Sequence, residues 1–160
     1  KTMSAIKKKK PAVENRRAKF NYVIEEVIEA GLVLNGQEIR SIRRGKVSLD
    51  NSYAAEKDNS IWIYNTHIHI EKNNTLSKDE INPLRPRKLL LKKKEINKLK
   101  TKLNNNGFTL IPLNIHYNKK GFAKVDIGIS KGRKKEDKRE YKKEQDWKRE
   151  KDRLISKNLK

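Results

Sequence analysis

The last thirty residues constrain the fold most, because they cannot form a core of their own. Residues 131–160 contain 14 Lys and Arg against 7 Asp and Glu, with one glycine and no proline. Burial of so few apolar side chains cannot offset the entropy lost on ordering this segment. The sequence therefore predicts a basic C-terminal tail that is disordered when free. A polyanionic partner, and nucleic acid first of all, is the kind of molecule that such a tail would bind.

Positive charge is concentrated at both ends of the chain. The net formal charge is +21, and residues 1–19, 20–130 and 131–160 each contribute an excess of seven positive charges. The central segment is therefore only mildly basic for its length, so its binding surface should be a patch rather than a uniform coat. Such a surface favours phosphate backbones and an affinity that depends on salt. Solvated lysines alone would not gather at the two ends.

Composition also excludes several classes of protein. The chain has no cysteine, which excludes disulfides and thiolate metal sites and agrees with a reducing compartment. No apolar run approaches the roughly 20 residues that a membrane-spanning helix needs. The basic N-terminal residues are not followed by the apolar core of a secretory signal. We therefore expect a cytoplasmic protein.

Periodicity in the first half of the chain indicates mostly strands. Residues 1–14 are expected to form a disordered basic arm. Residues 20–34 are expected to form a long strand with a kink or bulge at Ala30-Gly31. A helix is the alternative for residues 20–34, because they include helix-forming residues such as Glu and Ala. A short helix should follow, with Asn35 as its N-cap, Glu38 in a capping box and Gly45 at its end. Residues 52–57 and 61–70 should form a hairpin around Asp58-Asn59.

The second half repeats this alternation of strand and helix. We expect a mobile loop at 71–87, a short strand at 89–91, a basic helix ended by Gly107, and two final strands, with a bulge or an edge position at Pro112. About six short antiparallel strands with two helices suggest a small barrel, of which the oligonucleotide-binding (OB) barrel is one example. Whether the barrel is closed stays open at this stage.

Motifs for catalysis or metal binding are weak. His67 and His69 are two residues apart on a strand, so both side chains should point to the same face. His116 is the only other histidine, and packing or surface exposure explains the three histidines better than a metal site does. Glu25 and Glu29 should point away from Glu26, so no tight carboxylate trio is expected. We therefore predict no enzyme activity, no metal and no cofactor. Aromatic residues beside basic ones, which suit stacking on unpaired bases, are a stronger signal: they are Phe20, Tyr22, Tyr117, Phe122, Tyr141 and Trp147.

Several stretches taken together resemble one known family. They are NRRAKFNYVIEEVIEAGLVLNGQEIRSIRRGKVSL (15–49), NSYAAEKDNSIWIYNTHI (51–68), PLRPRKLLLKKKEI (83–96) and GFAKVDIGISKGRKKEDKR (121–139). In this order they resemble small protein B, the tmRNA-binding family of bacterial trans-translation. The resemblance implies an OB-type β-barrel at 15–130, with flanking helices, and a tail at 131–160 that becomes helical on the ribosome. It also implies a non-enzymatic adaptor that binds the tRNA-like domain of tmRNA and helps deliver it to the A site of stalled ribosomes.

The resemblance also implies particular contact residues. Those expected to bind RNA are Asn15, Arg16, Arg17, Glu29, Lys88, Leu90 and Lys124. Those expected to occupy the decoding centre and the empty mRNA channel are Lys131, Gly132, Arg133, Lys134, Asp137, Lys138, Arg139, Lys143, Trp147, Leu154 and Ile155. The chain departs from the family pattern at Phe20, where histidine is common, and at Glu136, where a histidine or an aromatic residue is common.

The same resemblance suggests the partners. They are tmRNA, the ribosome with its ribosomal RNA, and elongation factor Tu through tmRNA, for a monomeric, cytoplasmic bacterial protein that does not bind membranes. The alternative function is that of a structural ribosomal-type protein bound permanently to ribosomal RNA.

Overall fold

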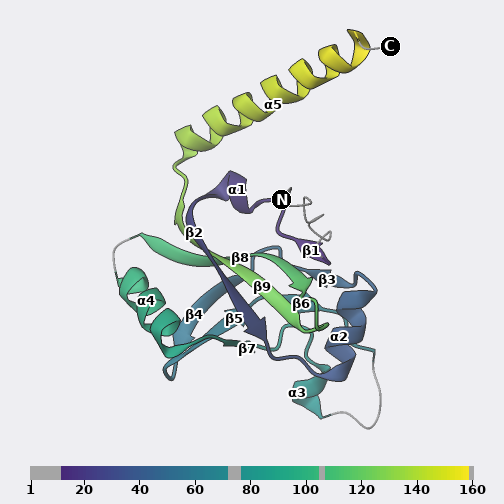
Figure 1. The fold of residues 1–160 in the computed structure, drawn as a ribbon, viewed down its shortest axis with the longest axis vertical. Coiled ribbons are helices and arrows are strands. Elements are labelled where there is room, and N and C mark those ends of the chain that lie inside the picture. Colours follow the sequence, from purple (N-terminus) through teal and green to yellow (C-terminus); the bar gives the residue numbers. More distant parts are fainter. Residues whose placement is uncertain (1–11, 72–76, 105–106, 159–160) are drawn as a thin grey trace, which may run out of the picture.

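The structure, a computed structural model, describes residues 12–71, 77–104 and 107–158 (Figure 1). Its strands are β1 (Val13–Glu14), β2 (Tyr22–Leu32), β3 (Val47–Ser48), β4 (Tyr53–Lys57), β5 (Ser60–Tyr64), β6 (His67–Ile68), β7 (Arg87–Leu90), β8 (Phe108–Tyr117) and β9 (Ala123–Gly132). Its helices are α1 (Ala18–Asn21), α2 (Gly36–Arg43), α3 (Lys78–Ile81), α4 (Lys93–Asn104) and α5 (Lys135–Asn158). None of the helices that the structure describes is long and apolar enough to span a bilayer.

Six antiparallel strands close into a ring. The strands follow the order β8-β4-β5-β7-β2-β9, and β9 pairs again with β8, so the sheet returns to its first strand. Strand β1 pairs with β8 beyond the residue at which β8 pairs with β4, and there Val13 lies opposite Ile115. The predicted fold, mainly β with flanking helices, is confirmed, and the ring is closed. Closure removes the exposed sheet edges that would otherwise pair with other chains.

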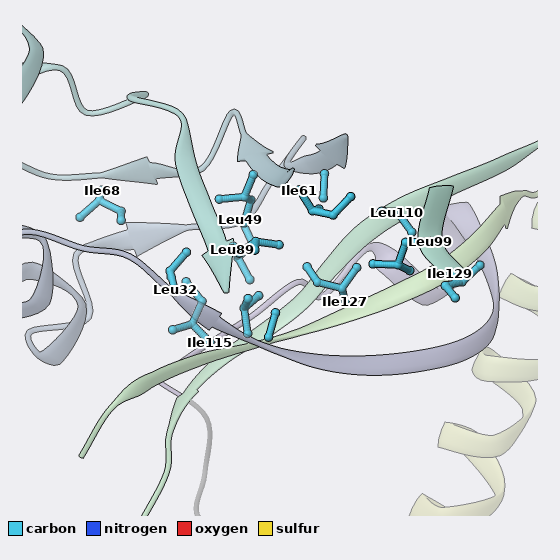
Figure 2. Packing of buried hydrophobic residues seen from close by; sticks show 14 of the residues in the cluster. Leu32, Leu49, Ile61, Ile68, Leu89, Leu99, Leu110, Ile115, Ile127 and Ile129 are labelled. Carbon is cyan, nitrogen blue, oxygen red and sulfur yellow. The ribbon is translucent and has the colours of Figure 1, made fainter. Parts of the chain in front are cut away.

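The interior of the ring is filled by aliphatic side chains (Figure 2). In β5, Ile61 and Ile63 are fully buried while the residues between and beside them are partly exposed, which is the period of two expected for a strand with one face inward. Leu99 of α4 and Ile42 of α2 belong to this core. The two helices lie at opposite sides of the ring in the view of Figure 1. Each such side chain contributes about 1.5–3 kcal/mol by leaving water.

Helix α2 begins as the sequence predicts. Asn35 accepts a hydrogen bond from the backbone N–H of Glu38 at 2.9 Å, and the Glu38 carboxylate accepts one from the Asn35 N–H at 3.1 Å. The capping box is therefore complete. The sequence did not predict that the same carboxylate is fully buried and bound by the guanidinium groups of Arg85 and Arg87.

The turn residues also behave largely as expected. Asp58 and Asn59 both have positive φ, which is typical of a tight two-residue hairpin turn. The register of β8 shifts between Pro112 and Asn114, so the predicted bulge at this proline is confirmed. Gly107 has a φ of 89°, as a residue just beyond a helix often does.

Three predictions of local structure were wrong in detail. The bulge in β2 lies between Ile24 and Glu26 rather than at Ala30-Gly31. The stretch 61–70 is not one strand, because Asn65 turns the chain with a φ of 59° and β6 pairs separately with β3. The predicted arm 1–14 ends in β1, although residues 1–11 lie outside the described part of the chain.

Two segments have more regular structure than predicted. The loop expected at 71–87 contains the short helix α3, and its residues 72–76 lie outside the described part of the chain. The tail, expected to be disordered when free and helical on the ribosome, is a single helix, α5, in this structure. The physical reason is local: no glycine or proline follows Gly132, Glu136 and Asp137 suit the positive end of the helix dipole, and Lys157 suits the negative end.

Candidate nucleic-acid interface

The outer face of β7, β2 and β9 brings together three of the predicted RNA-binding residues. Gly31 of β2 lies opposite Leu90 of β7 on one side and opposite Lys124 of β9 on the other. Glu29 lies two residues before Gly31 on the same face. Lys88 precedes Leu90 by two residues and is likewise exposed.

A groove crosses this face at Gly31, and we call it the Gly31 groove. Its volume is about 350 Å³, and Leu90, Tyr117, Phe122 and Lys124 are among the residues that line it. A Cβ atom at residue 31 would lie only 3.1 Å from the Leu90 Cβ, so glycine is needed for the Leu90 side chain to lie across the strand. This gives β2 a different reason for its glycine than the bulge that the sequence suggested.

The chemistry of the Gly31 groove suits a nucleotide. Leu90 and Phe122 are apolar, yet 58% and 64% exposed, so each offers a surface for the flat face of a base. Lys124 supplies positive charge for a phosphate at the same place. Exposed apolar side chains next to a lysine are typical of a binding surface, because solvated surfaces rarely need them.

Tyr117 forms part of the groove wall, and Arg43 of α2 lies over its ring at 5.6 Å from the centroid. Burial raises the pKa of the Tyr117 phenol, and the positive charge of Arg43 acts in the opposite direction. The ring is therefore neutral at physiological pH. Sequence reasoning singled out Tyr117 only as an aromatic near basic residues, because the approach of Arg43 depends on how α2 packs.

A chain of hydrogen bonds lies beside the groove. Asn114 donates to Asp126 at 3.0 Å, the Asn114 carbonyl oxygen lies 2.8 Å from Nδ1 of His116, and Nε2 of His116 lies 3.0 Å from Glu29. Ligand-type atoms of Glu29, His116 and Asp126 lie within 4.8 Å of one another. Both ring nitrogens of His116 are engaged by Glu29 and Asn114, so these side chains form a continuous hydrogen-bond chain.

The N-terminal predicted residues lie elsewhere. Asn15 and Arg17 line a second groove of about 550 Å³, together with Asn21, Asp50 and Tyr53. We call this the Asn15 groove. The Asn15 amide is bound to the carbonyl oxygen of Pro112 at 3.0 Å, so it also fixes the chain to β8.

Arg16 is exposed next to this groove. Among the residues that the structure describes, none lines both grooves, so the predicted RNA-binding residues divide into two groups.

The base of the tail is anchored to the ring. Arg133 donates from Nε to the Lys19 carbonyl oxygen at 2.9 Å, and its guanidinium lies 4.4 Å from the Tyr141 ring centroid. Tyr141 also faces Phe20 of α1 at 6.4 Å. Lys131 and Gly132, which were predicted as tail residues, belong to β9, and Lys131 lies over the Phe108 ring.

Beyond this base, α5 extends away from the ring (Figure 1). Trp147 is 70% exposed, and Leu154 and Ile155 are exposed as well. Most of the other predicted tail residues are also on the surface: Lys134, Asp137, Arg139 and Lys143 are exposed, and Lys138 is partly exposed. An exposed tryptophan followed by two exposed aliphatic residues leaves an unpartnered apolar stripe on a charged helix.

In architecture, this is a small closed ring of antiparallel strands with an appended basic helix. Comparison with known proteins narrows the class. The family described as "SmpB protein" matches residues 12–157. The chain therefore belongs to the SmpB family.

Individual relatives agree over almost the whole chain. An SsrA-binding protein of Rickettsia bellii is 49% identical over 148 residues, covering 92% of this chain and 96% of the relative. An SsrA-binding protein of Agrobacterium fabrum is 45% identical over 151 residues, covering 93% of this chain and 92% of the relative. A solved structure described as "tmRNA-SmpB: a journey to the center of the bacterial ribosome" matches with a TM-score of 0.63 and 39% identity. That match covers 80% of this chain and 92% of the other.

Proposed function

We propose that this protein binds tmRNA, also called SsrA RNA, and acts as an adaptor for ribosome rescue by trans-translation. Its membership of the SmpB family and the names of its relatives support this function. The solved structure to which it is similar is described as tmRNA-SmpB in the bacterial ribosome. In this role the protein binds the tRNA-like domain of tmRNA and helps to deliver it to the A site.

The observation that carries the proposal is the Gly31 groove. Leu90 and Lys124 lie on either side of Gly31, and Glu29 lies two residues away on the same face. These side chains supply an apolar surface for a base, a positive charge for a phosphate and a carboxylate that can accept from base N–H groups. Asn15, Arg16, Arg17 and Lys88 then provide further contacts to the phosphate backbone around the ring.

The tail has the second role in this proposal. Residues 15–130 bind the RNA, and the tail from about residue 131 enters the decoding centre and the empty mRNA channel. The net positive charge of α5 suits a channel walled by ribosomal RNA, and Trp147, Leu154 and Ile155 offer it apolar contacts. The protein works in the bacterial cytoplasm as a binding adaptor and catalyses no reaction itself.

The experiment that tests this function is to capture RNA with the protein from a bacterial lysate and to sequence it. Enrichment of tmRNA over ribosomal RNA is expected. The alternative, a structural ribosomal protein, would remain on ribosomes in one-to-one amounts after washing at high salt, whereas an adaptor would be substoichiometric. Capture of ribosomal RNA alone would contradict the proposal.

Salt dependence separates the charged contacts in the Gly31 groove from the apolar ones. Lys124→Ala should weaken tmRNA binding and reduce the slope of log affinity against log salt by about one, because one phosphate contact is removed. Leu90→Asp should weaken binding with little change in slope. Lys57→Ala, at an exposed lysine of β4 outside the groove, is the matched control. If both groove variants changed only the slope, the surface would be a nonspecific charge patch.

A further inference from the structure

The hydrogen-bond chain beside the Gly31 groove needs one more donated hydrogen than its residues supply when His116 is neutral. It runs from Asp126 through Asn114 and His116 to Glu29, across three neighbouring strands. Its two ends are carboxylates, which only accept hydrogen bonds when ionised. The three contacts of the chain therefore need three donated hydrogens from the two residues in the middle.

Asn114 can supply one of these hydrogens, because its amide donates on one side and accepts on the other. A neutral imidazole does the same, so a neutral His116 supplies one more. Two donors for three contacts leave one pair of acceptors facing each other, whichever way the amide is turned. One added proton removes the conflict. His116 is the place for it, since an imidazole binds a proton more readily than a carboxylate does.

We propose that His116 is a positioning residue for RNA binding: as an imidazolium it holds the Glu29 carboxylate in place and makes RNA affinity depend on pH. This inference rests on the proposed function, in which Glu29 contacts RNA. The Glu29 side chain is 54% exposed and the His116 side chain 23% exposed, so Glu29 faces the ligand while His116 supports it from behind. One oxygen of Glu29 binds His116, and the other is free of that contact.

The charges around His116 set the direction of the effect. Lys124 lies directly opposite it on β9, with Asp126 two residues further on the same face. Glu29 lies on β2, Glu14 of β1 is paired with Asn114, and Arg43 of α2 lies over the adjacent Tyr117. Loss of the His116 proton leaves its carboxylate neighbours with one less compensating charge. The groove then attracts phosphates less strongly, so RNA affinity falls as pH rises.

The proton can be observed without RNA. In nitrogen-resolved NMR spectra of the free protein at pH 6, His116 should show two ring N–H signals that exchange slowly with water, because both are hydrogen-bonded. His67 and His69, which are exposed, should show none. Signals that vanish in His116→Gln identify the residue. A His116 with only one protected ring N–H would overturn the inference.

The binding test uses transcribed tmRNA at constant salt. Wild-type affinity should fall roughly fivefold between pH 6 and pH 8 as the proton is lost. His116→Gln should bind at the weaker, pH 8 level throughout, because its amide donates once and accepts once as a neutral imidazole does. His67→Gln is the matched control and should keep the wild-type pH profile.

Two results distinguish a failure of the positioning role of His116 from a failure of the proposed function. If the His116→Gln variant keeps the wild-type pH profile while tmRNA still binds, the positioning role is overturned and the proposed function stands. If His116 shows both ring signals but the wild-type protein binds no tmRNA at any pH, the proposed function is overturned, and the proton on the chain is supported.

Discussion

The Glu38 carboxylate has two structural roles. It completes the cap of α2, and it is fully buried against Arg85 and the equally buried Arg87. Burial lowers the pKa of the Arg87 guanidinium, while the negative charge of Glu38 raises it again. Arg87 also donates to the Thr66 carbonyl oxygen at 2.5 Å, so the cluster ties α2, β7 and the segment before β6 together.

Removing the charge of Glu38 should therefore destabilise the fold severely. In Glu38→Gln the caps can persist, but Arg87 stays buried without its counterion, which costs about 3–5 kcal/mol. Urea denaturation at pH 7 measures the loss. The matched control is Glu71→Gln, which breaks the Arg44–Glu71 pair, whose side chains are 55% and 62% exposed. That change should cost less than about 0.5 kcal/mol.

Adding one methyl group at residue 31 tests whether the Leu90 side chain contacts RNA. Gly31→Ala places a Cβ 3.1 Å from the Cβ of Leu90, so the Leu90 side chain must move off the strand. We expect tmRNA affinity to fall roughly tenfold, the equivalent of about 1.4 kcal/mol. Gly36→Ala, where a Cβ would meet nothing within 4 Å, is the matched control. Equal affinity of the two variants in a filter-binding assay would argue against Leu90 as an RNA contact.

At the scale of elements, the ring and the tail helix are stabilised differently. Strands β2, β8 and β9 share long ladders and a common core. None of the described residues of α5 is buried, and the helix contacts the ring only at its base. Its backbone is helical because of local sequence, and local terms alone hold a helix of this length only marginally in water.

Hydrogen exchange should reveal this difference. Amides of residues 146–158 should exchange nearly as fast as in an unfolded chain, because opening there breaks no tertiary contact. Amides in the β8–β9 ladder should be protected by orders of magnitude more. Phe20→Ala should extend the fast exchange towards the base of α5 at residues 138–142. Strong protection along the whole of α5 in the free protein would contradict this prediction.

The sequence predicts the elements better than their long-range contacts. The capping box at Asn35, the turn at Asp58-Asn59 and the bulge at Pro112 follow from local rules and are confirmed. The buried Glu38–Arg87 pair could not be predicted, because its members lie 49 residues apart and meet only after the ring closes.

The same limit applies to the candidate site. Resemblance picked out Glu29, Leu90 and Lys124, and the pairing of strands brings them together. It gave no sign of His116 as a neighbour of Glu29, since that contact spans 87 residues. The helix of the tail was expected only on the ribosome: low apolar content argues against packing, but it does not prevent a single helix.

For the whole molecule, the two surfaces should separate by truncation. Strand β9 runs to Gly132, and the Arg133 N–H donates to the Asn21 carbonyl oxygen, so a protein ending at Lys134 keeps the ring intact. It should bind tmRNA within about tenfold of the full chain, because the tail adds mainly electrostatic attraction to the RNA backbone. It should fail to support tagging of proteins on stalled ribosomes.

Two outcomes would contradict this division. Full tagging by the truncated protein would remove the tail from the ribosomal role. Loss of tmRNA binding would place the tail in the primary RNA site. A charge-matched control is the full chain with Trp147→Ala, which keeps every charge of α5 and should also bind tmRNA normally while tagging is impaired.

Among the described residues, α5 is attached to the ring through one small cluster of side chains at its base. A helix of 24 residues is about 36 Å long. Over that length, a rotation of about 10° at the base moves the far end by roughly 6 Å, more than the width of one strand spacing. The direction in which α5 points therefore depends on how Arg133 and Tyr141 pack against Lys19 and Phe20. A substitution at Phe20, far from the tip in both sequence and space, would redirect the tip without touching it.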